Sequence, residues 1–298
     1  MNLKNYSPFI GMALLLLIVQ LIAVSLSKPF EANDIKAFSN PEDTGNVVLW
    51  IAIILVFTAF IFLVVRMNKK WIIKAFILLT VASTLYFVFF ALFSIVLPPM
   101  LNLILTLLLS IGLTIVLYKF PEWYIIDITG VIIAGGASSM FGISLAIFPT
   151  LILLVLLAVY DYIAVYKTKH MVALAEGVMD LRLPILFVIP RHLKYSFLSE
   201  KFDKAEREAF FMGLGDAVIP TLLVVSANYF VNAPAFSFPL IGAVNIPAIG
   251  AIVGTFAGFA VLTGFVIKGK PQAGLPFLNG GVILGYVAGS LIAGSALI

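Results

Sequence analysis

Nine apolar runs divide this sequence, and nearly all of them match the roughly 20 residues that a helix needs to cross a bilayer. They cover approximately residues 8–26, 47–66, 71–97, 100–118, 124–147, 149–166, 209–230, 243–267 and 276–297. Lipid offers the backbone no hydrogen-bond partners, so such segments must be helical. With 62% hydrophobic and 11% charged residues, the chain has more apolar surface than a water-soluble fold can bury. We therefore predict an all-α polytopic membrane protein, one membrane domain over residues 1–298, with nine transmembrane helices.

The basic residues indicate how these helices are oriented. Of the 18 Lys and Arg residues, all but Lys28 and Lys36 fall on one side of a nine-helix topology. Lys and Arg are enriched in cytoplasmic loops, so the N-terminus is predicted to be cytoplasmic and the C-terminus outside. The same rule predicts a cytoplasmic loop at 167–208, which separates helices one to six (1–166) from helices seven to nine (209–298).

Several classes of chemistry are excluded by what the sequence lacks. There is no cysteine, which removes disulfide frameworks, cysteine zinc sites and thiol nucleophiles. No H-E-x-x-H motif is present, so a zinc protease is not expected. Both histidines, His170 and His192, fall in the predicted loop, which argues against a membrane Ser–His protease. We expect neither a metal nor an organic cofactor.

Two aspartates lie inside apolar runs. Asp161 comes six residues before Lys167, where the sixth run ends, and Asp216 comes eight residues after Glu208, where the seventh begins. A carboxyl group in hydrocarbon costs several kcal/mol, so it is rare without a function. At about 1.5 Å rise per residue, both lie about 9–12 Å below the same membrane face. Equal depth on adjacent antiparallel helices predicts a pair.

Short motifs accompany both aspartates. Gly213 and Gly215 flank Leu214 just before the second aspartate, and they leave the helix face around it free of side chains, which gives another backbone or a substrate access. Tyr160 precedes the first aspartate. Its hydroxyl suits either a hydrogen bond in a polar pocket or a place at the membrane interface.

A third motif, Ala273, Gly274, Leu275 and Pro276, directly precedes the ninth run. The prolines at positions 271 and 276 disfavour helix and favour a short extended stretch. Irregular backbone at membrane depth must line a cavity or pack within protein. The alternative, an ordinary helix start bounded by proline, is the better reading of this motif taken alone.

Together these motifs resemble the presenilin and signal-peptide-peptidase family of intramembrane aspartyl proteases. The closer likeness is to presenilin, whose pattern is matched by Ala158–Asp161, by Ala164–Val165 and by Gly213–Asp216. The third family motif, Pro-Ala-Leu, here reads Ala273-Gly274-Leu275 and is followed by the usual proline. Nine helices with aspartates on the sixth and seventh extend the likeness over essentially the whole chain.

The resemblance implies a function and a site. It implies hydrolysis of peptide bonds within membrane helices of other proteins, by two carboxyl groups that share one proton and activate a water. The implied catalytic residues are Asp161 and Asp216, the supporting residues are Tyr160, Gly213, Leu214 and Gly215, and the substrate-positioning residues are Ala273, Gly274, Leu275 and Pro276. We expect an integral protein of a microbial plasma membrane that needs no obligate partner subunit, although it can form oligomers, and that has no nucleic-acid ligand.

Two other functions fit part of this pattern. Paired membrane aspartates also serve ion- or proton-coupled transporters and channels, but no inverted repeat of the kind found in many transporters is visible. A catalytically idle scaffold that binds membrane helices has no need of both aspartates.

Three further segments carry structural expectations. The apolar segment Leu181–Pro190 is too short to span and is predicted to be extended, as an edge for substrate or a collar on the bundle. Asp127 is expected to reach the nearby surface and to be structural. Glycines recur every fourth residue in the last two runs, which predicts close helix packing; these are Gly250, Gly254 and Gly258, and Gly281, Gly285 and Gly289.

Overall fold

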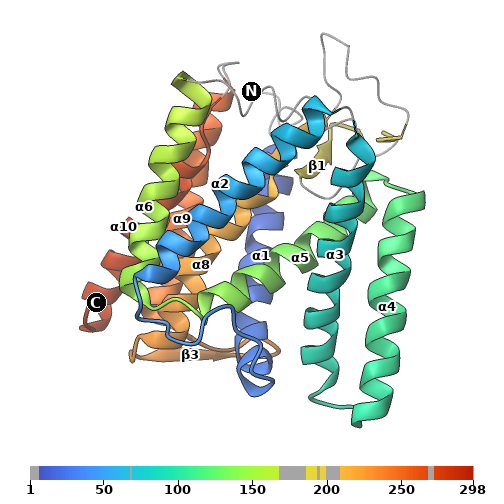
Figure 1. Ribbon diagram of the computed structural model, residues 1–298. Coiled ribbons are helices and arrows are strands. Elements are labelled where there is room, and N and C mark those ends of the chain that lie inside the picture. The colour runs from blue at the N-terminus through green and yellow to red at the C-terminus, as the bar shows by residue number, and fades with distance from the viewer. Residues whose placement is uncertain are drawn as a thin grey trace.

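The computed structural model describes residues 7–67, 69–167, 186–192, 195–198, 209–267 and 272–297. In this part of the chain nine α-helices form a bundle (Figure 1). They are α1 (Ser7–Ala32), α2 (Gly45–Arg66), α3 (Lys70–Phe93), α4 (Pro99–Lys119), α5 (Trp123–Gly142), α6 (Ile147–Tyr162), α8 (Leu214–Phe230), α9 (Ile246–Val266) and α10 (Leu275–Ala293). A π-helical turn, η2 (Ile163–Lys167), extends α6.

Each predicted apolar run overlaps one of these helices, although α1 continues to Ala32, past the predicted end at 26, and α5 ends at Gly142, before the predicted 147. Among the described residues, eight helices are long and apolar enough to cross a membrane, whereas α8 has only 17 residues. The predicted start of the seventh helix at residue 209 is wrong, because residues 209–213 form a strand. The third helix ends at Phe93, before the predicted 97, where the chain turns ahead of Pro98 and Pro99.

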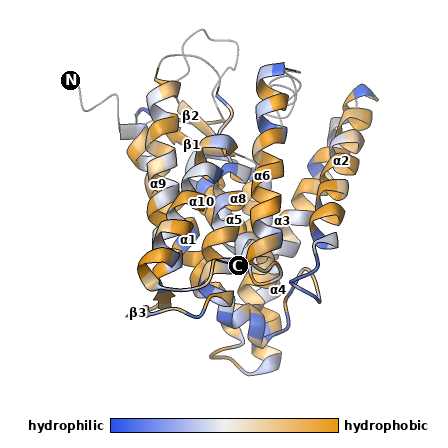
Figure 2. Ribbon diagram, turned by 90° about the vertical axis from the view of Figure 1, so that its left-hand side faces the viewer, coloured by the Kyte–Doolittle hydropathy of each residue, from blue (hydrophilic) through white to orange (hydrophobic). Residues whose placement is uncertain are grey.

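The outer helices expose the apolar surface that the composition predicts. Large side chains such as Val56 on α2, Leu79 on α3 and Leu108 on α4 are more than 60% exposed. Figure 2 shows hydrophobic residues along most of α2. Contiguous apolar surface of this extent is stable only against lipid, so these faces mark an integral membrane protein.

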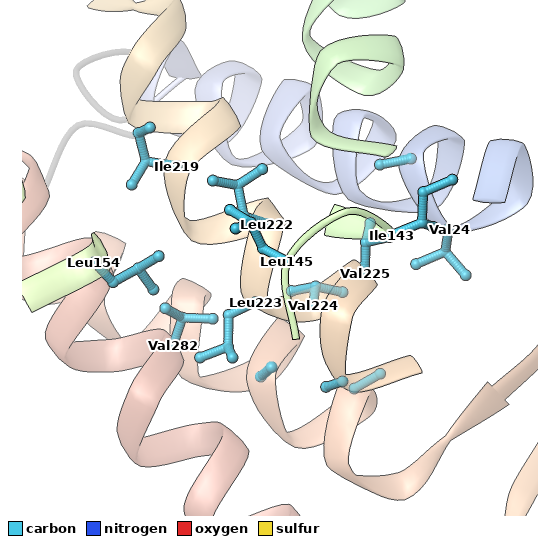
Figure 3. Close-up of a cluster of buried hydrophobic side chains, with 14 of the residues drawn as sticks. Val24, Ile143, Leu145, Leu154, Ile219, Leu222, Leu223, Val224, Val225 and Val282 are labelled. Atoms are coloured by element: carbon cyan, nitrogen blue, oxygen red, sulfur yellow. The ribbon is translucent and has the colours of Figure 1, made fainter. Parts of the chain in front are cut away.

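The core surrounds α8. Nine consecutive residues of this helix, 219–227, are buried, as expected for a helix enclosed by others. In Figure 3 its side chains meet Leu154 of α6 and Val282 of α10 on one side, and Val24 of α1 on the other. The helix that carries Asp216 is therefore held from several directions.

Glycines bring α9 and α10 into backbone contact, which confirms the close packing predicted from their spacing. A Cβ on Gly254 would lie 2.2 Å from the carbonyl oxygen of Gly281, and one on Gly285 would lie 2.1 Å from that of Gly250. No real Cβ contact is that short, so these positions accept only glycine without separation of the helices. The pair forms one rigid wall of the bundle.

We expect Gly254→Val to destabilise the bundle by about 3 kcal/mol or more, because overpacking here can be relieved only by moving backbone. Thermal unfolding in detergent measures the effect. Gly264→Val on the same helix is the control, since a Cβ there meets nothing within 4 Å. Equal stability of the two variants would contradict the inferred backbone contact.

Two small antiparallel sheets lie at opposite ends of the bundle, as the labels β1 and β3 show in Figure 1. One pairs β1 (Leu186–Pro190) with β2 (Ala209–Gly213), and the other pairs β3 (Ala235–Phe238) with β4 (Gly242–Asn245). The prediction of an extended segment is confirmed for residues 186–190, and residues 181–185 lie outside the described part. The predicted start of the eighth helix at 243 falls in β4 and is wrong.

The β1–β2 sheet is packed on both faces. Phe187 and Met212 are paired across the strands and belong to a cluster with α1, α8 and α9. Val188 and Phe211, the next pair, face a second cluster with α3, α4 and α5. Alternation of side chains along a strand produces this two-sided burial. Because β2 ends where α8 begins, the sheet holds the start of α8 in place.

Candidate active site

Asp161 lies in the last turn of α6, immediately before the helix widens into η2. Its side chain is 7% exposed. One carboxyl oxygen accepts a hydrogen bond of 3.1 Å from the backbone N–H of Leu275, which starts α10. Contact with α10 therefore orients this carboxyl group.

Asp216 is the third residue of α8 and follows directly from the end of β2. Gly213 is the last residue of the strand and the N-cap of the helix. The Asp216 carboxyl group turns back towards the Gly213 backbone, which interacts with it by a hydrogen bond. An acidic side chain at this position commonly pairs with the N-cap amide and with the positive end of the helix dipole. The strand-to-helix junction thus sets the direction of the carboxyl group.

The two carboxyl groups meet at the Gly274–Leu275 step. Leu275 donates to Asp161, while a Cβ on Gly274 would lie 3.0 Å from the carboxyl carbon and both carboxyl oxygens of Asp216. The aspartates also lie close enough to interact electrostatically. The structure therefore places side chains from α6 and α8 against two consecutive residues that precede and begin α10.

Gly274 is the residue of the third motif that this approach requires. Its φ of −77° and ψ of −45° are open to any residue, so the need for glycine is spatial and not conformational. Those dihedrals are helical, and Leu275 and Pro276 already belong to α10, so the extended stretch predicted over 273–276 is wrong for all three residues. Proline is tolerated in the first turn of a helix, where its missing N–H is not needed.

The glycines before Asp216 have different surroundings. A Cβ on Gly215 would meet nothing within 4 Å, whereas one on Gly213 would lie 3.4 Å from a carboxyl oxygen of Asp216. Leu214 between them packs into the core and lies 3.1 Å from the place where a Cβ on Gly130 would stand. The open side of the motif is therefore at Gly215. Tyr160 is half-buried next to Asp161, and Ala273 is fully buried.

A tyrosine that the sequence analysis did not single out holds the chain before α10. The Tyr166 hydroxyl, on η2, donates to Gln272 Oε1 at 2.5 Å and accepts from Ala273 N at 3.4 Å. The π-helical turn changes the direction of residue 166 relative to an α-helix, and such turns are frequent at functional sites. The only sequence signal was an aromatic residue near the end of a span.

We expect Tyr166→Phe to lower turnover about tenfold with little change in thermal stability. The lost hydroxyl is partly exposed, but it fixes the segment that contacts both aspartates, and one hydrogen bond is worth about 1 kcal/mol. Initial rates of substrate cleavage measure this effect. Tyr118→Phe is a control, since that exposed side chain lies on α4. Wild-type rates in the Tyr166 variant would contradict the role.

A groove of about 350 Å³ lies between α6 and α10, and neither aspartate is in its lining. Its lining is almost wholly apolar and consists of Leu154, Val155, Ala158, Val159, Tyr162, Pro276, Asn279, Gly280 and Ile283. A larger cavity, of about 550 Å³, lies at the start of α6 and the end of α8 and contains neither aspartate. The smaller groove includes Ala158, three residues before Asp161, and Pro276, the residue after Leu275, so it is the one adjoining the segments that carry the site.

No cluster of three or more His, Cys, Asp or Glu side chains able to hold a metal occurs in the described ranges. His192 is exposed, and His170 lies outside those ranges. The expectation that Asp127 reaches the surface is wrong: it is 5% exposed and accepts a 2.7 Å hydrogen bond from Val188 N.

Comparison with known proteins identifies the class. The family model described as signal-peptide peptidase, presenilin aspartyl protease matches residues 12–295. Two solved structures of a presenilin family intramembrane aspartate protease, in space groups C222 and P2, are each 39% identical to this chain and cover 96% of it. Their TM-scores are 0.73 and 0.71, and the matches include 100% and 98% of their own chains. No curated protein sequence matches.

Two carboxyl groups contact consecutive backbone residues inside an apolar helical bundle. These are the features of a membrane-embedded aspartyl protease. This chain belongs to the signal-peptide peptidase and presenilin family of aspartyl proteases, and it is an intramembrane aspartic endopeptidase. The resemblance inferred from the motifs is thereby confirmed. The protease interpretation holds over the transporter and the scaffold.

Proposed function

We propose that Asp161 and Asp216 form the catalytic pair that hydrolyses a peptide bond in a membrane helix of another protein. The observation that carries this proposal is their convergence on Gly274 and Leu275 from two different helices. Two carboxyl groups this close in a site away from bulk water do not both ionise readily, so the pair holds one proton. It therefore offers a general base and a general acid at once.

The reaction follows from that shared proton. The ionised carboxylate removes a proton from a water between the two side chains as the water oxygen attacks the scissile carbonyl carbon. The protonated carboxyl donates its proton to the carbonyl oxygen, giving a tetrahedral intermediate. Proton transfer to the amide nitrogen then breaks the C–N bond and releases an amine and a carboxylic acid. No covalent adduct with the enzyme forms, and no metal or organic cofactor is required.

The substrate approaches through the groove between α6 and α10. Its apolar lining suits a lipid-embedded segment, and Ala158 and Pro276 in that lining lie close in sequence to Asp161 and Leu275. A helical backbone shields its carbonyl carbons, so the substrate must unwind before cleavage. Ala273 to Pro276 position the opened segment, and the half-buried Tyr160 supports the site.

The outer edge of β2, with which no described strand pairs, provides a partner for the unwound substrate. In an antiparallel pair, successive residues point their N–H and C=O groups alternately towards the partner strand and away from it. Val188 N–H points away from β2, because it donates to Asp127, so the backbone groups of its partner Phe211 also point outwards. Phe211 lies two residues before Gly213, so a third strand added here ends beside Asp216.

The setting we propose has a cytoplasmic N-terminus and an external C-terminus, with the 167–208 loop in the cytoplasm and the chain acting as one membrane domain. The distribution of Lys and Arg supports this orientation. The enzyme resides in a microbial plasma membrane, acts on single-span substrates and needs no obligate partner subunit.

Cleavage by the purified protein in detergent tests this function. The substrates are a series of single-span peptides. Each peptide has one proline, placed at a different position around the cleavage site. If the substrate adds to β2 as a strand, proline at every second position removes an N–H that bonds to β2, and turnover of those peptides should fall. Peptides with proline at the positions between should still be cleaved. A uniform effect of proline would contradict pairing with β2. Absence of any cleavage by the wild type would contradict a self-sufficient enzyme.

A further inference from the structure

Asp127 is a buried acidic residue that the proposed reaction does not use. It lies in the second turn of α5, is 5% exposed and is the acceptor of a 2.7 Å hydrogen bond from Val188 N in the middle of β1. A carboxyl group in a membrane helix is expensive to bury, so it is expected to have a specific partner. Its described partner is a strand amide and not a charged side chain.

This contact closes one edge of the β1–β2 sheet. Val188 pairs in register with Phe211, but its N–H is directed to α5, so it belongs to the outer edge of β1. Unpaired edge amides are the groups to which another extended chain adds. Asp127 occupies the central amide of that edge, whereas no described strand pairs with the outer edge of β2.

One turn further along, α5 contacts the active-site motif itself. Gly130 has no side chain, and a Cβ there would lie 3.1 Å from both the Phe187 ring and the Leu214 side chain. Phe187 precedes Val188 in β1, and Leu214 lies between the two glycines of the motif before Asp216. The same face of α5 therefore touches the strand pair and the residue next to the N-cap of α8.

At its start, α5 also holds the chain that follows β1. The Glu122 carboxylate accepts hydrogen bonds from Ser196 Oγ at 2.6 Å and from Phe197 N at 3.0 Å. Glu122 thus anchors the segment beyond the strand, whereas Asp127 anchors the strand itself. Only the Asp127 contact determines which edge of the sheet is covered.

We propose that Asp127 is a positioning residue that fixes β1 on α5, covers its outer edge, and so leaves the β2 edge beside Asp216 to receive the substrate. The inference rests on the proposed function, because it assigns substrate to β2. What matters at position 127 is an oxygen that accepts the Val188 amide proton. Asparagine provides such an oxygen, and leucine, of similar size, does not.

Three variants separate this role from general stability. Asp127→Leu is expected to lower kcat/KM about 10- to 100-fold, since small displacements of a reacting group have effects of this size. Asp127→Asn is expected to stay within about threefold of the wild type, because its side-chain oxygen still accepts the bond. Thr129→Val is the matched control on the same helix: its buried hydroxyl has no hydrogen-bond partner among the described residues, so the variant should be unaffected.

Amide hydrogen exchange at Val188 gives a readout that does not depend on catalysis. Exchange should be slow in the wild type, in Asp127→Asn and in Thr129→Val, and at least tenfold faster in Asp127→Leu. If the leucine variant fails to fold, Val188→Pro takes its place, because it removes the same N–H from an edge position where proline is tolerated. Its cleavage rate should then fall as predicted for the leucine variant.

Two results would overturn the proposal. One is that Asp127→Leu cleaves substrate at the wild-type rate and keeps slow exchange at Val188. Cleavage at the wild-type rate by Val188→Pro, if that variant is used instead, counts in the same way. The other is loss of activity in Asp127→Asn equal to that in the leucine variant while Val188 remains protected, which would mean that the acid itself is needed. Failure of the wild type to cleave any substrate would instead count against the proposed function, and the exchange measurement would still decide the Asp127 contact.

Discussion

Asp216→Asn and Asp161→Asn are each expected to reduce peptide-bond hydrolysis at least about 10³-fold while leaving the bundle folded. Asparagine has nearly the same shape as aspartate and keeps an oxygen that can accept from Leu275 N at position 161 or from the Gly213 backbone at position 216. It cannot exchange a proton with water, and general acid–base catalysis of this kind contributes about 10²–10⁴-fold. Because the pair acts as a unit, the double variant should lose little more than either single variant.

Single-turnover cleavage with product detection by mass spectrometry measures these rates, and thermal unfolding reports on the fold. Asp34→Asn is the matched control, because that carboxylate is exposed in the turn after α1. Substantial turnover by either site variant would remove that aspartate from the catalytic pair. Losses that multiply in the double variant would show two independent roles.

Gly274→Val is expected to lower turnover about 100-fold, because the new side chain must displace either the Asp216 carboxyl group or the start of α10. Its Cβ alone would stand 3.0 Å from three atoms of that carboxyl group, and the two valine methyl groups lie beyond it. Misplacement of a reacting group by about 1 Å can cost 10²-fold. Gly274→Ala should be intermediate, since a shift of a few tenths of an ångström accommodates one methyl group.

Turnover and unfolding are measured on the same preparations of these variants. Gly112→Val on α4 is the control, since a Cβ there meets nothing within 4 Å. The overpacking at position 274 is expected to destabilise the fold by about 1–3 kcal/mol, so the loss of turnover must be measured at a temperature where all variants are folded. Turnover of the valine variant equal to that of the wild type would contradict the contact between Gly274 and Asp216.

Much of the architecture was predictable because it depends on local sequence. Apolar runs of sufficient length identify membrane helices wherever they occur, and each of the nine predicted runs overlaps a described helix. Glycines at every fourth position lie on one face of a helix, so the close contact of α9 and α10 followed from their spacing. The two aspartates were recognisable because an acid inside an apolar run is rare.

The errors at element ends came from partners distant in sequence. Residues 209–213 were read as helix because they continue an apolar run, but β1 pairs with them and makes them a strand. The extended stretch predicted at 273–276 is wrong from Gly274 onwards, because Gly274 has helical dihedrals and α10 begins at Leu275. An apolar run specifies burial, and only the available hydrogen-bond partner decides between strand and helix.

Sequence alone determined that this protein lies in a membrane, where its apolar helices fall along the chain, and which two acids lie inside apolar runs. Tertiary structure decided how those acids are held: Leu275 meets Asp161 over 114 residues, Gln272 meets Tyr166 over 106, and Val188 meets Asp127 over 61. The physical reason is the distance along the sequence over which each interaction acts. Hydrophobic periodicity and insertion cost act within one segment, whereas a hydrogen bond between segments depends on how the helices and strands pack, which no single segment encodes.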